Sequence, residues 1–295
     1  LAELGFNRIS LGVQDFNLAV QEAVHRVQTI EETQAVMDWS RKYGFKSRSV
    51  DLIYGLPKQT PATFKETVDA VLAMNPDRLS VYNYAHLPHI FKPQRRIAEA
   101  DLPAAADKLD ILSNTITRLG EAEYVFIGMD HFALKSVTLF EALKNKNLHR
   151  NFMGYTASKT RVMIGLGVSS ISDSWYGFAQ NEKELETYYD SINRNELPVF
   201  RGHILTEEDL IIRQHILNLM CQFKTTWHYN EGNFKELHEV LDSLQEMSHD
   251  ELLVIKPNSL TVTEKGKPFV RNICMAFDLR LKRRTPQNQL FSMTV

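Results

Sequence analysis

Short apolar runs alternate with longer amphipathic segments in the first half of the chain, and this alternation is what most constrains the fold. The runs Arg8–Val13, Ser49–Tyr54 and Arg78–Ala85 have the length and composition of buried strands. Segments with helical periodicity separate or follow them, at residues 29–43, 60–72 and 104–121. Strand and helix in alternation with short links predict right-handed βαβ units and a parallel sheet, an α/β fold. A doubly wound open sheet and a β/α barrel both fit this pattern.

The remainder of the chain changes character near Pro198. Between Tyr124 and Tyr176 the pattern predicts strands at 124–130 and 162–171, followed by an amphipathic helix at 182–195. Beyond Pro198 it predicts helices at 206–221, 233–243 and 264–281, with a hairpin formed by 252–255 and 259–262. We therefore expect two domains, an α/β part at 1–198 and a mostly helical, winged-helix-like part at 199–295.

The first residues predict that the chain is a fragment of a longer protein. Leu1 opens the sequence LAELGFN, which has the pattern of a helix end with Gly5 as its stop, and a strand follows at once.

Composition is typical of a soluble protein and argues against two classes of partner. The 295 residues carry a net charge of −2, and residues 201–295 hold 12 Lys and Arg against 12 Asp and Glu. A nucleic-acid-binding domain usually has a basic face, so we expect no nucleic acid. No apolar run is long enough to span a bilayer, and no leader pattern is present. Cys221 and Cys274 lie far apart, which predicts packed thiols in a reducing, cytoplasmic compartment.

Motifs for a metal or a nucleotide are weak. The histidines His86, His89, His131 and His149 match no zinc spacing, so we expect no protein metal site. Gly165-Leu-Gly167 follows a predicted strand but lacks the third glycine of a dinucleotide loop, and a tight backbone turn explains it equally well.

Polar and small residues at the predicted strand ends are the better candidates for a site. In either α/β arrangement ligands gather at the carboxyl ends of parallel strands. Gln14 ends an apolar strand, and Asp51 lies within the apolar run VDLIY, where an unpartnered carboxylate would be costly. With Arg26 and Ala85 these residues form the candidate set. For each residue two roles fit the sequence, a structural hydrogen bond and a contact to a ligand.

Longer strings resemble one family specifically. They are GVQDFN, DLIYGLPKQT, NPDRLSVYNYAHLP, FIGMDHFA, LHRNFMGYT and RNICMAFD. Together these strings resemble the oxygen-independent coproporphyrinogen III oxidases, radical S-adenosylmethionine (SAM) enzymes of haem biosynthesis, and the resemblance runs from the first residue to the last. The GVQ and GLPxQT parts of the first two strings also occur in relatives, including a haem-chaperone-like branch, so a haem-binding paralogue without oxidase activity is the alternative.

The resemblance implies a fold and a set of cofactors. The fold would be the later part of an incomplete radical-SAM β/α barrel, followed by the helical domain. The implied cofactors are a [4Fe–4S] cluster and two SAM molecules. The C-x-x-x-C-x-x-C loop that would ligate the cluster is absent from this sequence, so the chain alone is expected to be inactive. By position, Gln14, Arg26, Asp51 and Ala85 resemble contacts to the second SAM, and Ile171 a contact to the cluster-bound SAM.

The implied reaction is the oxidative decarboxylation of two propionates of coproporphyrinogen III to vinyl groups, giving protoporphyrinogen IX. The implied partners are this substrate and an electron donor such as flavodoxin or ferredoxin, for a monomeric cytoplasmic enzyme. The resemblance names no residue of this chain as catalytic.

Overall fold

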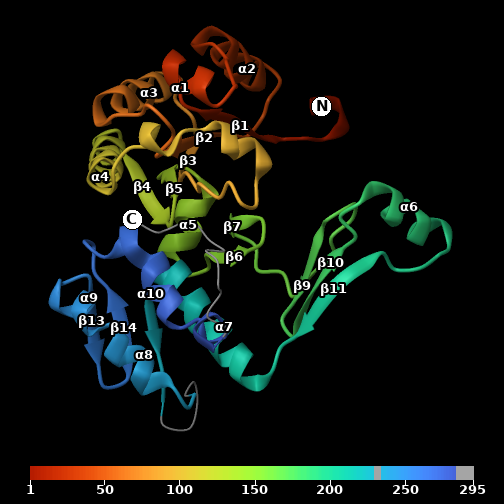
Figure 1. The fold of residues 1–295 in the computed structure, drawn as a ribbon, viewed down its shortest axis with the longest axis vertical. Coiled ribbons are helices and arrows are strands. Elements are labelled where there is room, and N and C mark those ends of the chain that lie inside the picture. The colour runs from red at the N-terminus through yellow and green to blue at the C-terminus, as the bar shows by residue number, and fades with distance from the viewer. Residues whose placement is uncertain (229–233, 284–295) are drawn as a thin grey trace. The chain divides into compact units, whose positions relative to one another are not determined.

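The computed structural model describes residues 1–228 and 234–283 (Figure 1). These residues form two compact units, Leu1–Glu141 and Ala142–Arg283. The division comes earlier in the chain than the domain boundary predicted at Pro198. The two-domain division at residue 198 stays a prediction.

A five-stranded sheet is the framework of the first unit. Its strands are β1 (Arg8–Gln14), β2 (Ser47–Tyr54), β3 (Arg78–Asn83), β4 (Tyr124–Gly128) and β5 (His131–Leu134), in the order β1-β2-β3-β5-β4. The three strands predicted first, β1 to β3, are parallel neighbours, as expected for βαβ units.

The rest of this sheet departs from the prediction of a parallel sheet. β5 runs antiparallel to β3 and pairs antiparallel with β4, so the sheet is mixed. The cause is a tight reversal after β4, where Gly128 has φ 155° and Met129 has φ 46°. That reversal turns the single strand predicted at 124–130 into a hairpin.

Helices connect the parallel strands, and local signals define their ends. They are α1 (Leu18–Ala23), α2 (Ile30–Lys42), α3 (Pro61–Ala73) and α4 (Ala105–Glu121), with 3₁₀ turns at Ala2–Leu4, Lys92–Arg96 and Glu99–Asp101. Thr29 caps α2 in a capping box with Glu32, and Thr60 caps α3 ahead of a proline in its first turn. Gly44 follows α2 with φ 76° and ends it, as predicted.

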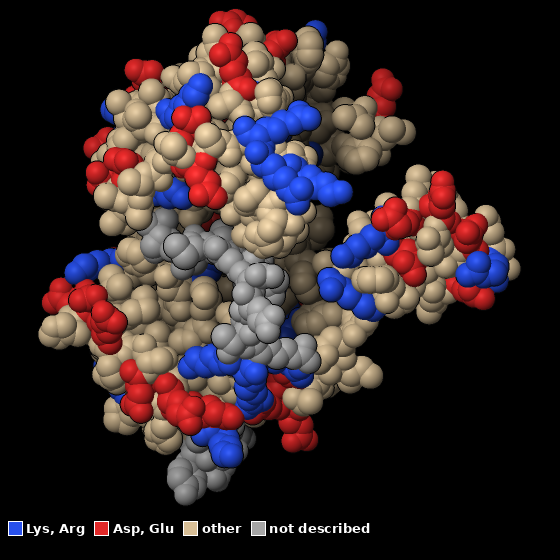
Figure 2. Space-filling model, viewed as in Figure 1, with Lys and Arg blue, Asp and Glu red and all other residues tan. Residues whose placement is uncertain are grey.

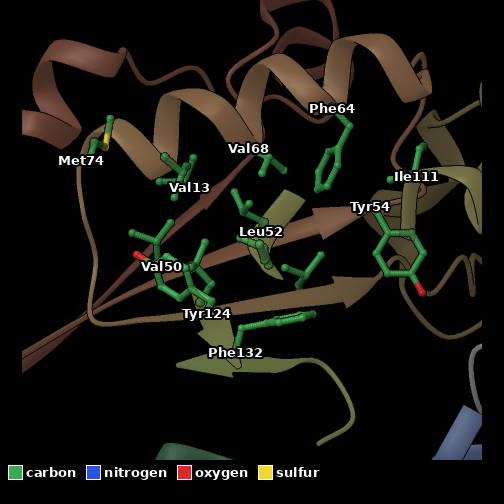
Figure 3. Close-up of a cluster of buried hydrophobic side chains, with 14 of the residues drawn as sticks. Val13, Val50, Leu52, Tyr54, Phe64, Val68, Met74, Ile111, Tyr124 and Phe132 are labelled. Carbon is green, nitrogen blue, oxygen red and sulfur yellow. The ribbon is translucent and has the colours of Figure 1, made fainter. Parts of the chain in front are cut away.

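The core of the first unit lies between the sheet and its helices (Figure 3). Phe64 and Val68 of α3 and Ile111 of α4 pack with Leu52 of β2 and Phe132 of β5, and all five are at most 2% exposed. Burial of side chains from α3 and α4 against β2 holds the carboxyl ends of the parallel strands in a fixed arrangement.

The second unit begins within α5 (Thr138–Lys144). The hairpin β6 (His149–Asn151) and β7 (Gly154–Thr156) follows. A four-stranded sheet then has the order β11-β10-β9-β8, with the helix α6 (Leu185–Asn193) inserted between β10 and β11. Its strands are β8 (Val162–Met163), β9 (Ile171–Ser174), β10 (Gly177–Asn181) and β11 (Val199–Ile204). The single strand predicted at 162–171 was wrong, because the turn containing Gly167 (φ 99°) separates β8 from β9.

The C-terminal part has the predicted helices and hairpin, with one correction. Its elements are α7 (Glu207–Gln222), β12 (Lys224–Thr226), α8 (Leu237–Ser243), α9 (Gln245–His249), β13 (Leu253–Lys256) and β14 (Ser259–Val262). The one long helix predicted at 264–281 was wrong. A 3₁₀ turn at Lys267–Phe269, which contains Pro268, precedes α10 (Val270–Ala276), and α11 (Leu279–Arg283) is separate. Asp278 starts α11 by accepting a hydrogen bond from the Leu281 amide. Residue 233, the first of the helix predicted at 233–243, lies outside the described residues.

Charge on the visible surface is mixed. Figure 2 shows acidic and basic side chains interspersed over both units. Among the described residues, no helix combines the length and apolarity that a membrane crossing requires.

Candidate functional site

Arg26 and Gln14 converge on the carboxyl end of β1. The Nη2 atom of Arg26 donates a hydrogen bond to the Gly12 carbonyl at 2.6 Å. A β-carbon at Gly12 would lie 2.9 Å from Gln14 Nε2 and 3.1 Å from Arg26 Nη2. Gly12 therefore lets both side chains lie against the strand, and any larger residue there would displace them.

Gln14 has two further marks of a binding residue. Its backbone is left-handed, with φ 67°, where the pairing of β1 with β2 shifts register. Its side-chain Oε1 is buried and accepts no hydrogen bond from the residues that the structure describes. A strained backbone and an unsatisfied buried acceptor are both costly, and both are typical of positions that meet a ligand.

Asp51 lies beside this pair. In the register of the sheet it is directly opposite Gly12, the residue against which the Gln14 and Arg26 side chains lie. Asp51 is partly buried and accepts a hydrogen bond from Ser10 Oγ at 3.0 Å. The fold therefore brings Gln14, Arg26 and Asp51 together, although they are up to 37 positions apart in the chain.

Ala85 follows β3, the next strand of the sheet, and its loop is fixed by one side chain. Gln94 Nε2 donates to the Ala85 carbonyl at 2.9 Å, and Gln94 Oε1 accepts from the Leu87 amide at 2.5 Å. Because β1, β2 and β3 are parallel neighbours, Ala85 lies at the same edge as the other three residues. Gln94 was missed from the sequence, since nothing local links it to Ala85.

Asp15, next to Gln14, has a structural role. It is 1% exposed, and it accepts hydrogen bonds from the Asn17 amide at 2.7 Å, Thr67 Oγ1 at 2.7 Å and Gln59 Nε2 at 2.5 Å. Burial raises the pKa of this carboxyl, and these hydrogen bonds only partly oppose the rise. Gln59 also donates to the Ile53 carbonyl at 2.8 Å, so Asp15 ties the end of β1 to the turn after β2.

Ile171 belongs to the second unit, at the start of β9. A β-carbon at Gly165 would lie 2.8 Å from the Ile171 carbonyl oxygen, so the chain needs glycine at that close approach. Asn181 Nδ2 donates to the carbonyls of Gly165 at 3.1 Å and Gly167 at 2.9 Å. The two glycines thus form a structural turn that positions the Ile171 backbone.

A cavity of about 480 Å³ in the second unit contains an ion pair at one wall. Arg213 Nη2 donates to Asp173 Oδ1 at 2.7 Å, and Arg213 Nη1 donates to the Ser174 carbonyl at 2.8 Å. The same guanidinium lies over the rings of Trp175 and Phe178. Arg213 is therefore committed to protein contacts and ties α7 to β9 and β10.

Neither cysteine fits an iron–sulfur cluster. Cys221 and Cys274 are buried, and burial raises the pKa of each thiol to about 12. A cluster ligand must be a thiolate, and several must converge. Within the described ranges no three His, Cys, Asp or Glu side chains are grouped as a metal site would need.

Comparison with known proteins gives a consistent result. The model of the radical SAM superfamily matches residues 1–71. The chain is 46% identical to the oxygen-independent coproporphyrinogen III oxidase of Salmonella typhimurium over 97% of its length, and 45% identical to that of Escherichia coli. It spans 64% of the length of each of these relatives.

A shorter relative and a solved structure extend this likeness. The oxygen-independent coproporphyrinogen III oxidase of Thermostichus vulcanus is 41% identical, and the match covers 96% of this chain and 89% of that one. The structure of the Escherichia coli coproporphyrinogen III oxidase, a radical SAM enzyme, superposes with a TM-score of 0.87 over 94% of this chain and 65% of that one, at 45% identity. The α/β fold and the homology agree, and the chain belongs to the oxygen-independent coproporphyrinogen III oxidase family.

Proposed function

We propose that this chain takes part in the oxidative decarboxylation of two propionates of coproporphyrinogen III to vinyl groups, giving protoporphyrinogen IX. The observation that carries the proposal is the structural match to the Escherichia coli oxidase, with 45% identity over 94% of the chain. The matching relatives are named as oxidases, which favours this activity over the haem-chaperone alternative.

The family implies a [4Fe–4S] cluster and SAM as cofactors. When bound, they supply the one-electron chemistry that removes a hydrogen atom from a propionate side chain. The buried thiols of this chain do not suit the cluster. We therefore place its ligands in the part of the family's length that this sequence does not span, and expect the chain alone to be inactive.

The strand-end residues suit a second SAM molecule. The Arg26 guanidinium can donate to a methionine carboxylate, and Gln14 Oε1 offers a buried acceptor for an ammonium or hydroxyl donor. Asp51 can accept from the same groups, and the small side chain of Ala85 lets a ligand approach β3 closely. Ile171 would contribute an apolar wall to the SAM bound at the cluster.

The remaining partners are proposed on the same basis. We expect coproporphyrinogen III as substrate, a small electron-transfer protein such as flavodoxin or ferredoxin as donor, and a monomeric cytoplasmic enzyme.

A chimaera tests the function. The N-terminal third of the Escherichia coli oxidase, fused ahead of Leu1, is reconstituted anaerobically with iron, sulfide and SAM, and its tetrapyrrole products are separated after oxidation. We expect conversion to protoporphyrin IX, and about a hundredfold slower conversion in the chimaera with Arg26→Ala, because one charged hydrogen-bonding group is lost. Exposed Arg194 serves as the control in the matched Arg194→Ala chimaera.

Two outcomes would count against the proposal. Tight haem binding without conversion by a chimaera that carries an intact cluster would favour the chaperone alternative. Equal rates for the Arg26→Ala and Arg194→Ala chimaeras would remove Arg26 from the site.

A further inference from the structure

Lys108 of α4 lies at the carboxyl edge of the parallel strands, outside the set described above. A β-carbon at Gly55, just after β2, would lie 3.2 Å from Lys108 Cε and 3.3 Å from Asn83 Oδ1. Gly55 has φ 83°, so the absence of a side chain and the left-handed turn together make room for the lysine stem. The Lys108 side chain thus runs over the turn between β2 and α3, beside the end of β3.

The position of Lys108 in its helix is electrostatically unfavourable. It is the fourth residue of α4, close to the positive pole of the helix, where a cation is disfavoured. Helical side chains lean toward the N-terminus, which carries the ammonium toward the strand ends. The N-cap Ala104 makes no side-chain hydrogen bond, and Asp107 is the acidic residue of this first turn.

The ammonium of Lys108 has no ion-pair partner among the described residues, although the side chain is only partly exposed. Burial lowers its pKa, and no carboxylate restores it. A half-buried cation without a counterion at a ligand-binding edge is typical of a residue whose partner arrives with the ligand.

Other cations share this edge. The 3₁₀ turn Lys92–Arg96, which Gln94 fastens to the Ala85 loop, exposes Lys92, Arg95 and Arg96. Basic side chains gather on the visible face of the first unit in Figure 2. The carboxylate of Asp15 is buried within its own hydrogen bonds, which leaves Asp51 as the one acidic member of the strand-end set against these lysines and arginines. The edge therefore suits a ligand that carries carboxylates.

We propose that Lys108 binds a carboxylate of the ligand held at the carboxyl ends of β1, β2 and β3. The inference rests on the proposed function, which supplies two ligands with that chemistry: coproporphyrinogen III through its propionates, and SAM through its methionine carboxylate. Asn83 lies beside the same stem and is placed to orient the bound group.

Binding measurements on the 295-residue chain test the inference. The ligands are coproporphyrin III, followed by its fluorescence, and SAM and decarboxylated SAM, followed by calorimetry. Lys108→Gln removes the charge and Lys108→Arg keeps it. Lys42→Gln is the matched control, because Lys42 is an exposed lysine at the end of α2, near the amino edge of the sheet. Circular dichroism establishes that each variant is folded.

If a propionate is the partner, Lys108→Gln weakens coproporphyrin III binding about ten- to a hundredfold and leaves the affinity for SAM unchanged. If the methionine carboxylate is the partner, Lys108→Gln weakens the binding of SAM but not the binding of decarboxylated SAM. In both cases the affinity of Lys108→Arg is within a few-fold of the wild-type affinity, and the affinity of Lys42→Gln equals that of the wild type.

Unchanged affinity of Lys108→Gln for both ligands, with a wild type that binds them, overturns this inference and leaves the proposed function standing. An equal loss in Lys108→Gln and Lys108→Arg also overturns it, since only packing would then matter. A wild-type chain that binds neither ligand also overturns the inference, and conversion by the chimaera then decides the proposed function separately.

Discussion

At the scale of single residues, two neighbouring side chains at the end of β1, Gln14 and Asp15, have different roles. Gln14 presents a buried acceptor without a partner, whereas the neighbouring Asp15 has all its hydrogen bonds made within the protein. Gln14 has a left-handed backbone at the end of the strand, and the two neighbouring side chains have separate surroundings. The sequence predicted Gln14 as a candidate, and only the contacts distinguish its role from that of Asp15.

Replacement of Asp15 should therefore damage stability more than a surface change would. Asp15→Ala leaves the Gln59 amide and the Thr67 hydroxyl without their partner inside the core, and we expect a loss of about 2–4 kcal/mol in the free energy of unfolding. Urea denaturation measures it. The exposed Asp110→Ala is the control and should stay within about 0.5 kcal/mol of the wild type. Similar values for the two variants would show that the Asp15 network is not structural.

At the scale of elements, the sequence predicted what local chemistry decides. The capping threonines Thr29, Thr60 and Thr206 mark helix starts that the structure confirms, because a cap acts within one turn. Strands β1 to β3 were predicted because a continuous apolar run is also a local signal. The predictions were wrong where a turn or a distant strand determines the element. The β4–β5 hairpin is an example, because β5 pairs with β3.

The candidate site shows the same limit. Gln14 and Asp51 could be predicted because strand ends are recognisable in the sequence. Gln94 and Lys108 could not, because each reaches the site from a segment whose position depends on the whole fold.

The start of α7 gives a prediction about pH. Asp209 closes the capping box with Thr206 and accepts two hydrogen bonds from Arg280 of α11, both at 2.7 Å. The Arg280 hydrogen bonds hold the pKa of this carboxyl well below its usual value. A depressed pKa contributes stability that is fully present above the unfolded value near 3.8 and is lost progressively as the pH falls from there through the lower pKa of the folded state.

Asp209→Asn should consequently be less stable than the wild type by about 1–3 kcal/mol at pH 7, and the gap should narrow progressively as the pH falls below about 4. Urea unfolding from pH 7 to pH 2.5 measures the difference. Asp242→Asn, an exposed change on α8, should show no such dependence. A gap that stays constant with pH would mean that the charge of Asp209 contributes nothing.

At the scale of the whole molecule, contacts within the second unit join residues on both sides of Pro198. Tyr155 Oη donates to the Met220 carbonyl at 2.9 Å, and Arg213 on α7 binds the Asp173 carboxylate and two carbonyls near it. A domain that began at residue 199 would lose all of these partners, and the Arg213 side chain, which is 15% exposed in the complete unit, would face solvent.

Two fragments of the chain distinguish the boundaries. Residues 142–295 keep the Arg213–Asp173 pair and should unfold cooperatively on heating, whereas residues 199–295 should melt earlier or not at all, followed by circular dichroism. Equal melting temperatures for the two fragments would instead support the boundary at Pro198. The expected result would mean that β6 to β11 fold with α7, so that Ile171 is positioned by the C-terminal part of the chain.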